Sequence, residues 1–142
     1  MSLLLLFNQP PYHRVLLDSA RRLAENGDHE ISVVTAQMAC EIFVEQAFVR
    51  IYAKKGLVHL EGPIDDLIPS YNLGNDKVRA LYSALTGDNV TAAGFWPDFK
   101  ELVKLRNGAV HSGRRVQRSE ADTGCIAAEK LVEHVDAAVE AG

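Results

Sequence analysis

The chain has 142 residues, of which 47% are hydrophobic and 24% are charged, and its formal net charge at pH 7 is −4. This length fits one domain, and the composition is that of an ordinary globular protein. The negative net charge excludes a protein that attracts nucleic acid through its overall charge alone.

The chain begins with a short apolar arm, Met1 to Phe7. The arm has no basic residue before its apolar run and no small-residue cleavage site, so it does not resemble a signal peptide. It is also far shorter than the ~20 residues that span a bilayer. We therefore expect a cytoplasmic protein without membrane association and one domain over residues 1–142, whose residues 1–11 form an arm that the domain or a partner covers.

The helical periodicity and the glycines divide the rest of the chain into helices. Gly27, Gly56, Gly87 and Gly113 each follow an amphipathic stretch, as glycines do at helix C-termini. We expect helices over about residues 12–26, 29–55, 75–86, 95–112 and 119–140, with Asp28 and Ser119 as N-caps and a short helical turn over 64–68. No segment alternates as a strand does. The sequence thus predicts an all-α fold, an antiparallel bundle of four to five helices.

The second helix carries an apolar stripe that we expect to be buried, formed by Ile31, Val34, Met38, Ile42, Val49 and Tyr52. Glu45 lies on this stripe, and Glu41 lies at its edge one turn earlier. A charge on a buried face must be paired or must face a ligand or a partner. These carboxylates therefore require a basic partner.

The fourth predicted helix supplies that partner. Phe99, Leu102, Val103 and Val110 define its apolar stripe, and Arg106 sits in the middle of it. We expect Arg106 to form a buried ion pair with Glu41 or Glu45, and the sequence does not decide which of the two carboxylates it is.

Asn107 and His111 follow Arg106 and flank the same stripe. They are four residues apart and share one side of the helix, whereas Arg106 and His111 point about 140° apart on a regular helix. Arg106 and His111 converge only if the arginine reaches around the helix, the helix distorts near Gly108, or a second subunit supplies one of them. This geometry indicates a site at a dimer interface.

The surroundings of Arg106 are basic although the chain is acidic. Six basic residues and one acid lie between Lys100 and Arg118, giving this segment +5 and leaving −9 for the remainder. A local positive stripe suits an anionic ligand, and Lys104, Arg114 and Arg115 are its candidate contacts to RNA phosphates. The alternative is a solvated charged face.

The segment Leu105-Arg-Asn-Gly-Ala-Val-His-Ser-Gly113 resembles the signature of HEPN domains. In these helical bundles an Arg is followed after four to six residues by a His, often with an Asn directly after the Arg. Many members are metal-independent endoribonucleases that act as homodimers, and others are toxins paired with antitoxins. A second match, Arg22 to His29, spans a helix break and lacks the Asn, so we take it as chance.

The resemblance implies that Arg106 and His111 are the catalytic pair, that Asn107 assists them and that Glu41 or Glu45 is the supporting carboxylate. Histidine titrates near neutrality and suits general acid–base catalysis, while arginine stabilises charge on phosphate. The remaining histidines show no metal-ligand spacing, so we expect no metal and no cofactor. The expected partners are RNA, a second copy of the chain and, in a toxin–antitoxin pair, a separate antitoxin protein.

Two other interpretations remain open. The chain is either a non-catalytic module that binds RNA, a nucleotide or a protein, or a structural dimerisation domain in which Arg106 only locks the helices. In the latter case His111 merely suits the negative end of its helix dipole.

Overall fold

The structure is a computed structural model that describes residues 10–142, and the apolar arm therefore lies outside the described residues. The described residues are all-helical, as predicted, with no strand. The helices are α2 (Tyr12–Glu25), α3 (His29–Lys55), α4 (Glu61–Leu67), α5 (Asp76–Thr86), α6 (Trp96–Ser112) and α7 (Arg118–Ala141), with two short 3-10 helices, η1 (Val58–Leu60) and η2 (Val90–Ala92).

Local sequence signals account for the ends of these helices. All four predicted glycines terminate helices; Gly113, for example, ends α6 with a φ of 64°, which a residue with a side chain rarely adopts. The α5 N-cap is Asn75, whose side chain accepts hydrogen bonds from the N–H groups of Lys77 and Val78. The expected Ser119 cap of α7 is wrong: the N-cap is Gln117, two residues earlier, which forms a capping box with Glu120.

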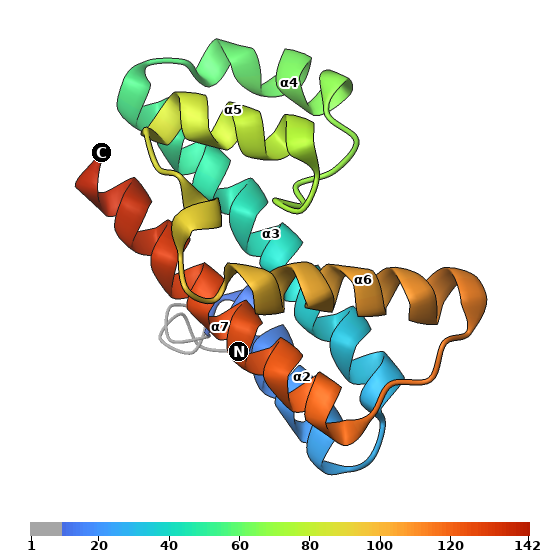
Figure 1. Cartoon of the computed structure of the whole chain (residues 1–142). Helices are drawn as coiled ribbons and strands as arrows, with labels where there is room; N and C mark the ends of the chain where they lie inside the picture. The colour runs from blue at the N-terminus through green and yellow to red at the C-terminus, as the bar shows by residue number, and fades with distance from the viewer. Residues whose placement is uncertain (1–9) are drawn as a thin grey trace, which may run out of the picture.

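The long helix α3 organises the bundle (Figure 1). It contacts α2 and α7 along much of its length, and α7 also contacts α2. The helix α6 crosses over α3 and α7, and its C-terminal part projects beyond both of them in Figure 1. The α4–α5 pair covers the other end of α3. The last turns of α6, which carry the end of the predicted motif, therefore extend beyond the rest of the bundle (Figure 1).

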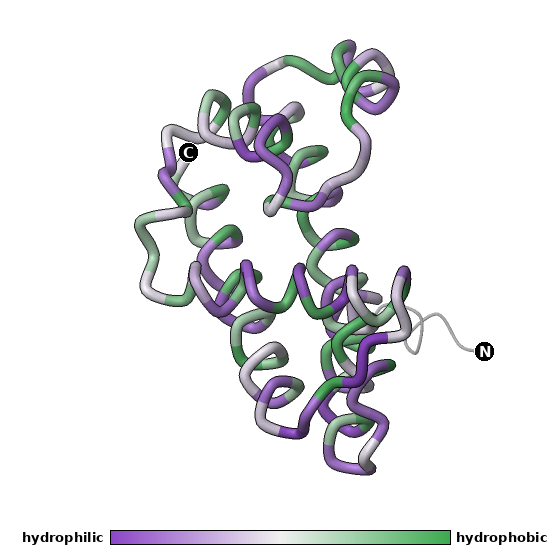
Figure 2. The backbone as a smooth tube through the Cα atoms, turned by 45° about the vertical axis from the view of Figure 1, so that its right-hand side comes forward, coloured by the Kyte–Doolittle hydropathy of each residue, from purple (hydrophilic) through white to green (hydrophobic). Residues whose placement is uncertain are grey.

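The core lies where α2, α3, α6 and α7 meet and extends to α5, whose Val78 and Tyr82 are fully buried. Hydrophobic and hydrophilic residues alternate along the helices in Figure 2, whereas the connection from α6 to α7 is mostly hydrophilic. The largest fully buried side chains include Phe48, Tyr52, Tyr82 and Phe99. The two cysteines, Cys40 and Cys125, are both free and buried. No described helix is long and apolar enough to cross a membrane.

The predicted buried stripe of α3 is mostly wrong. Tyr52 is buried, but Ile31, Met38 and Val49 are exposed, and Val34 and Ile42 are only partly buried. The buried face lies on the other side of α3, against α2 and α7. Its residues are often small, which lets helices approach closely, and they are Val33, Ala36, Ala39, Cys40, Phe43, Val44, Ala47, Phe48 and Ile51.

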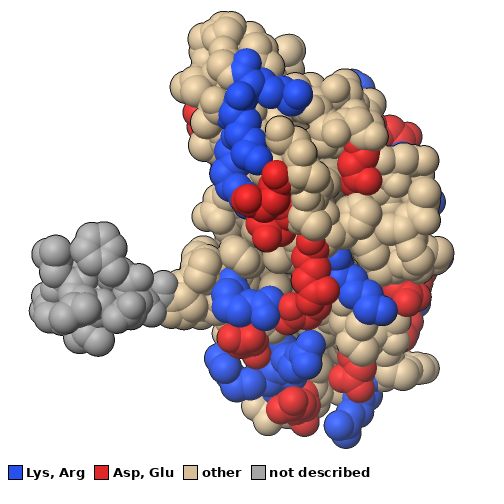
Figure 3. Space-filling view, turned by 90° about the vertical axis from the view of Figure 1, so that its left-hand side faces the viewer, with Lys and Arg blue, Asp and Glu red and all other residues tan. Residues whose placement is uncertain are grey.

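Ion pairs reinforce the contacts of α2 and α3 with α7. Arg14 of α2 lies 2.6 Å from Glu129, and Arg50 of α3 lies 2.8 Å from Asp136. Basic and acidic side chains are accordingly interspersed on the left-hand face of the molecule (Figure 3). Pairs this exposed contribute little, about 0–1 kcal/mol each. On this face Lys and Arg side chains form a short run at the top and are mixed with Asp and Glu below it (Figure 3).

Candidate functional site

The helix α6 positions the predicted motif. Pro97 and Asp98 occupy its first turn, where a missing N–H and a negative charge are both favourable. Its buried residues are Trp96, Phe99, Leu102 and Leu105. The predicted α6 stripe is therefore partly wrong: Val103 is half-buried and Val110 is 50% exposed. The buried stripe turns toward Leu105, which moves Arg106 from its centre to its edge.

Arg106 is half-buried at that edge. Its guanidinium Nη1 donates a hydrogen bond to Oδ1 of Asn107 at 3.1 Å. Among residues 10–142 no carboxylate lies within 4.0 Å of the guanidinium, so the expected buried ion pair with Glu41 or Glu45 does not form. Most of the donors of Arg106 therefore remain available to a ligand.

Glu41 is the carboxylate that Arg106 influences. It is half-buried on α3, and burial raises the pKa of its carboxyl, while the charge of Arg106 and hydrogen bonding with Ser70 act in the opposite direction. Glu45, one turn later, is exposed. Of the two candidate carboxylates, Glu41 is thus the one that lies in the electrostatic field of Arg106.

The connection before α5 closes over this region. Gly74 approaches α6 so closely that an added Cβ would lie 3.2 Å from a methyl group of Val103. The Asn72 side chain shapes this turn by accepting a hydrogen bond from the N–H of Gly74 at 2.8 Å. Helices α3 and α6 and this connection together frame Glu41 and Arg106.

Asn107 and His111 are both exposed on the outer side of α6. They do not converge with Arg106 in one chain beyond the Arg106–Asn107 hydrogen bond. The helix does not bend to bring His111 around, because residues 96–112 form one continuous α-helix. Of the three ways of uniting Arg106 with His111, the arginine turns to Asn107 and the helix is not distorted, which leaves only a contribution from a second molecule.

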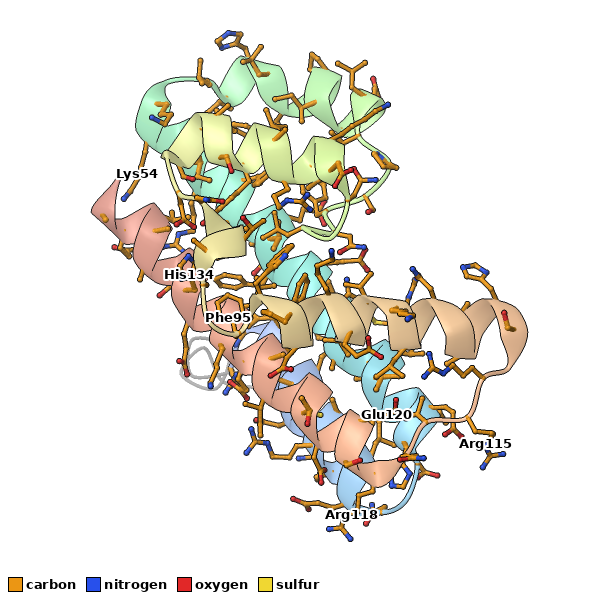
Figure 4. The ribbon with its side chains drawn as sticks, in the orientation of Figure 1. Lys54, Phe95, Arg115, Arg118, Glu120 and His134 are labelled. Carbon is orange, nitrogen blue, oxygen red and sulfur yellow. The ribbon has the colours of Figure 1, made fainter. Side chains whose placement is uncertain are left out.

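The basic stripe divides into two parts. Arg114 and Arg115 each lie 3.4 Å from a carboxylate, of Glu120 and Glu30 respectively, and Arg115 is almost fully exposed. Figure 4 shows Arg115 and Arg118 pointing outward at the connection to α7. Lys104 is exposed, and no described carboxylate lies within 4.0 Å of its ammonium.

Gly108 leaves room for the chain that folds back after α6. The aliphatic part of Arg114 folds back over it, and a Cβ at position 108 would lie 3.0 Å from Cδ of Arg114. The N–H of Arg114 also donates to the carbonyl of Gly108 at 3.0 Å. Because the chain folds back in this way, Arg114 lies close to the exposed end of α6.

The hollow between α6 and α7 does not belong to this site. It has a volume of about 180 Å³, and its polar lining includes Asp98, Glu101 and Glu120. Carboxylates repel phosphate, so this hollow does not suit RNA. Nor do any three His, Cys, Asp or Glu side chains of residues 10–142 cluster as a metal site would require.

Two polar features escape sequence reasoning. The first is His134, which is partly buried with its Nε2 2.8 Å from Oδ2 of Asp88. Tyr82 donates a hydrogen bond to the same oxygen at 2.7 Å. Phe95 packs edge-on against the His134 ring (Figure 4). Burial, followed by the hydrogen bond to Asp88, raises the pKa of Tyr82. This network ties α5 to α7 and has no sequence signature.

The second missed feature is Gln37, one turn before Glu41 on α3. It is 1% exposed, and neither its amide nitrogen nor its carbonyl oxygen has a hydrogen-bond partner among the described residues. Residues four apart share a helix face. Gln37 and Glu41 are therefore two neighbouring polar groups on α3 whose burial costs free energy.

Comparison with known proteins finds no matching family model, no matching curated protein and no matching solved structure.

Proposed function

We propose that the protein is a metal-independent endoribonuclease that cuts single-stranded RNA at a dimeric HEPN-like site formed by Arg106, Asn107 and His111. The observation that carries this proposal is that most hydrogen-bond donors of Arg106 are unengaged by residues 10–142. Its guanidinium is oriented by Asn107 and has no carboxylate within 4.0 Å among the described residues. A planar group with unengaged donors suits a phosphate.

The proposed reaction is a transfer at phosphorus. The RNA 2′-OH attacks the adjacent phosphorus, its proton passes to a neutral His111, and the P–O5′ bond breaks. A second, protonated His111 from the other subunit donates its proton to the leaving 5′-oxygen. The products are a 2′,3′-cyclic phosphate and a 5′-hydroxyl, and Arg106 stabilises the charge that develops on the phosphorane oxygens.

The neighbouring groups support these roles. The half-buried Glu41 restrains Arg106 electrostatically without occupying its donors. Lys104, Arg114 and Arg115 are exposed beside the motif and would contact flanking phosphates. Because Arg114 and Arg115 each lie near a carboxylate, RNA phosphates must displace these carboxylates or bind beside them. We expect modest affinity that falls as salt rises.

The test compares wild type with His111→Ala on labelled single-stranded RNA in EDTA. His59→Ala is the matched control, because His59 is also exposed but lies on η1. We expect His111→Ala to lose ~10²–10⁴-fold in rate, as the loss of a general acid–base group does, and His59→Ala to retain full activity. Products should carry 2′,3′-cyclic phosphate, and DNA should not be cut. Equal activity of all three proteins would contradict the proposal.

The second candidate function is a non-catalytic module of the same fold that binds RNA, a nucleotide or a protein such as an antitoxin. The separation of His111 from Arg106 within one chain favours it. Salt-sensitive RNA binding without cleavage by the wild type would select this alternative.

A further inference from the structure

Four apolar side chains form a stripe along one side of α3 that no other part of residues 10–142 fully covers. Ile31 is 58% exposed, Met38 43% and Val49 42%, while Ile42 is partly buried between them. These four side chains lie on one side of the helix, within about 40° of one another around its axis. Single exposed apolar residues are ordinary, but an apolar stripe along most of a 27-residue helix marks an interaction surface.

The stripe has a twofold-symmetric spacing. Its four apolar positions are symmetric about residue 40, so that 31 mirrors 49 and 38 mirrors 42. If two copies of α3 pack antiparallel with their centres at residue 40, each apolar residue therefore faces an apolar residue. Such self-complementarity is what a closed twofold interface requires.

We propose that a second copy of the chain docks on this face, with Ile31 against the partner's Val49 and Met38 against the partner's Ile42. The charges on α3 favour this direction. In the antiparallel arrangement Glu45 faces the partner's Thr35, whereas a parallel pair would place two copies of Glu45 against each other. Like charges in contact oppose association.

The same arrangement completes the proposed ribonuclease site, and this step rests on the proposed function. The charge of Arg106 acts to lower the pKa of Glu41. Glu41 lies about 80° around α3 from the centre of the stripe, on the side that α6 covers. The twofold axis of the antiparallel pair lies in the interface between the two copies of α3, called here the α3 seam, and runs perpendicular to both helices. Both copies of α6 therefore lie on the same side of the α3 seam. The second copy thus brings its own Asn107 and His111 toward Arg106.

The first test is the mass of the protein in solution at tens of micromolar, a concentration at which even a weak specific complex forms. We expect twice the chain mass of 15.6 kDa. Met38→Glu should raise the dimer dissociation constant at least about 30-fold, the loss typical of a hot-spot residue. Ile126→Glu is the matched control, because Ile126 is 51% exposed on α7, away from the stripe. It should leave the dimer intact.

The second test measures the register. Ile31→Cys should form a disulfide with Val49→Cys when the two variants are mixed. Ile31→Cys alone should not, because two copies of position 31 lie about 27 Å apart along the pair at 1.5 Å per residue. Cys40 and Cys125 are buried and do not compete.

The two proposals fail separately. A monomeric wild type, a Met38→Glu protein that dimerises like wild type, or self-linking of Ile31→Cys would overturn the α3 seam, even if RNA is cut. A dimer with the expected cross-link that leaves RNA intact would uphold the seam and refute the nuclease. Melting curves for Met38→Glu and Ile126→Glu, both at exposed helix positions, confirm that each variant is folded.

Discussion

Removing the guanidinium of Arg106 should scarcely change the stability of the protein. A buried ion pair would cost roughly 3–5 kcal/mol when broken. The structure instead shows a half-buried arginine whose hydrogen bond to Asn107 is exposed and whose guanidinium has no described carboxylate within 4.0 Å. Exposed polar interactions of this kind contribute about 0.2–1 kcal/mol. For a chain of this size the corresponding loss in melting temperature is about 2–4 °C or less.

Urea unfolding of Arg106→Ala measures this difference, with Leu102→Ala as the reference for true burial. Leu102 is fully buried on the inner face of α6, so its truncation should lower the unfolding free energy by about 2–5 kcal/mol. A loss of 3 kcal/mol or more for Arg106→Ala would refute the reasoning and place the guanidinium in a buried pair. A small loss makes Arg106→Ala a suitable probe of the proposed catalysis, because a fall in the proposed RNA cleavage would then not result from unfolding.

Two further predictions concern α3. Burial raises the pKa of Glu41, so the folded state binds its proton more readily than the unfolded state, and stability falls as pH rises from the ordinary Glu value through the raised one. Glu41→Gln should therefore stabilise the protein at pH 8 and not at pH 4, whereas the exposed Glu45→Gln should do neither; equal melting shifts at both pH values would contradict this. Gln37→Met should raise the unfolding free energy by about 1–3 kcal/mol, because it removes two buried unpartnered polar atoms, and a loss of stability would mean that Gln37 has a partner.

The sequence predicts the helices well because their ends depend on neighbouring residues. Gly27, Gly56 and Gly113 end helices by adopting a backbone conformation that other residues avoid, and this requirement is local. The cap of α7 is less predictable. Both Ser119 and Gln117 precede an acid by three residues, and only the course of the preceding connection decides which of them caps the helix.

The rotation of α3 about its axis is not readable from the sequence. Apolar side chains surround most of the helix, including Phe43 and Ala47 on the buried face and Met38 and Ile42 on the other. Periodicity identifies a buried face only when the opposite face is polar. The choice of α3 neighbours thus depends on long-range packing, and so does the pairing of His134 with Asp88.

The sequence predicts that one helix carries Arg106, Asn107 and His111, but it does not predict the contacts that these residues make. The spacing of Arg106, Asn107 and His111 is a local pattern, and α6 displays it as a continuous helix. The burial of Arg106 was misjudged because Val103 and Val110 suggested a stripe centred on it, whereas Leu105 takes the buried position. One step of about 100° around a helix thus decides whether an arginine is a structural partner or a ligand contact.

The features of α3 that reduce the stability of an isolated chain occupy adjacent positions around the helix. Gln37 is buried without a partner among the described residues, burial raises the pKa of the half-buried Glu41, and Met38 and Ile42 form the centre of the apolar stripe. Stability alone would favour apolar residues at the first two positions and polar residues at the next two. Violations of local rules are expected where a sequence serves a function at the expense of stability. Because a second copy on the stripe would remove the exposed apolar surface and bring its own motif to the same edge of α3, one association would offset part of this cost and complete the proposed site.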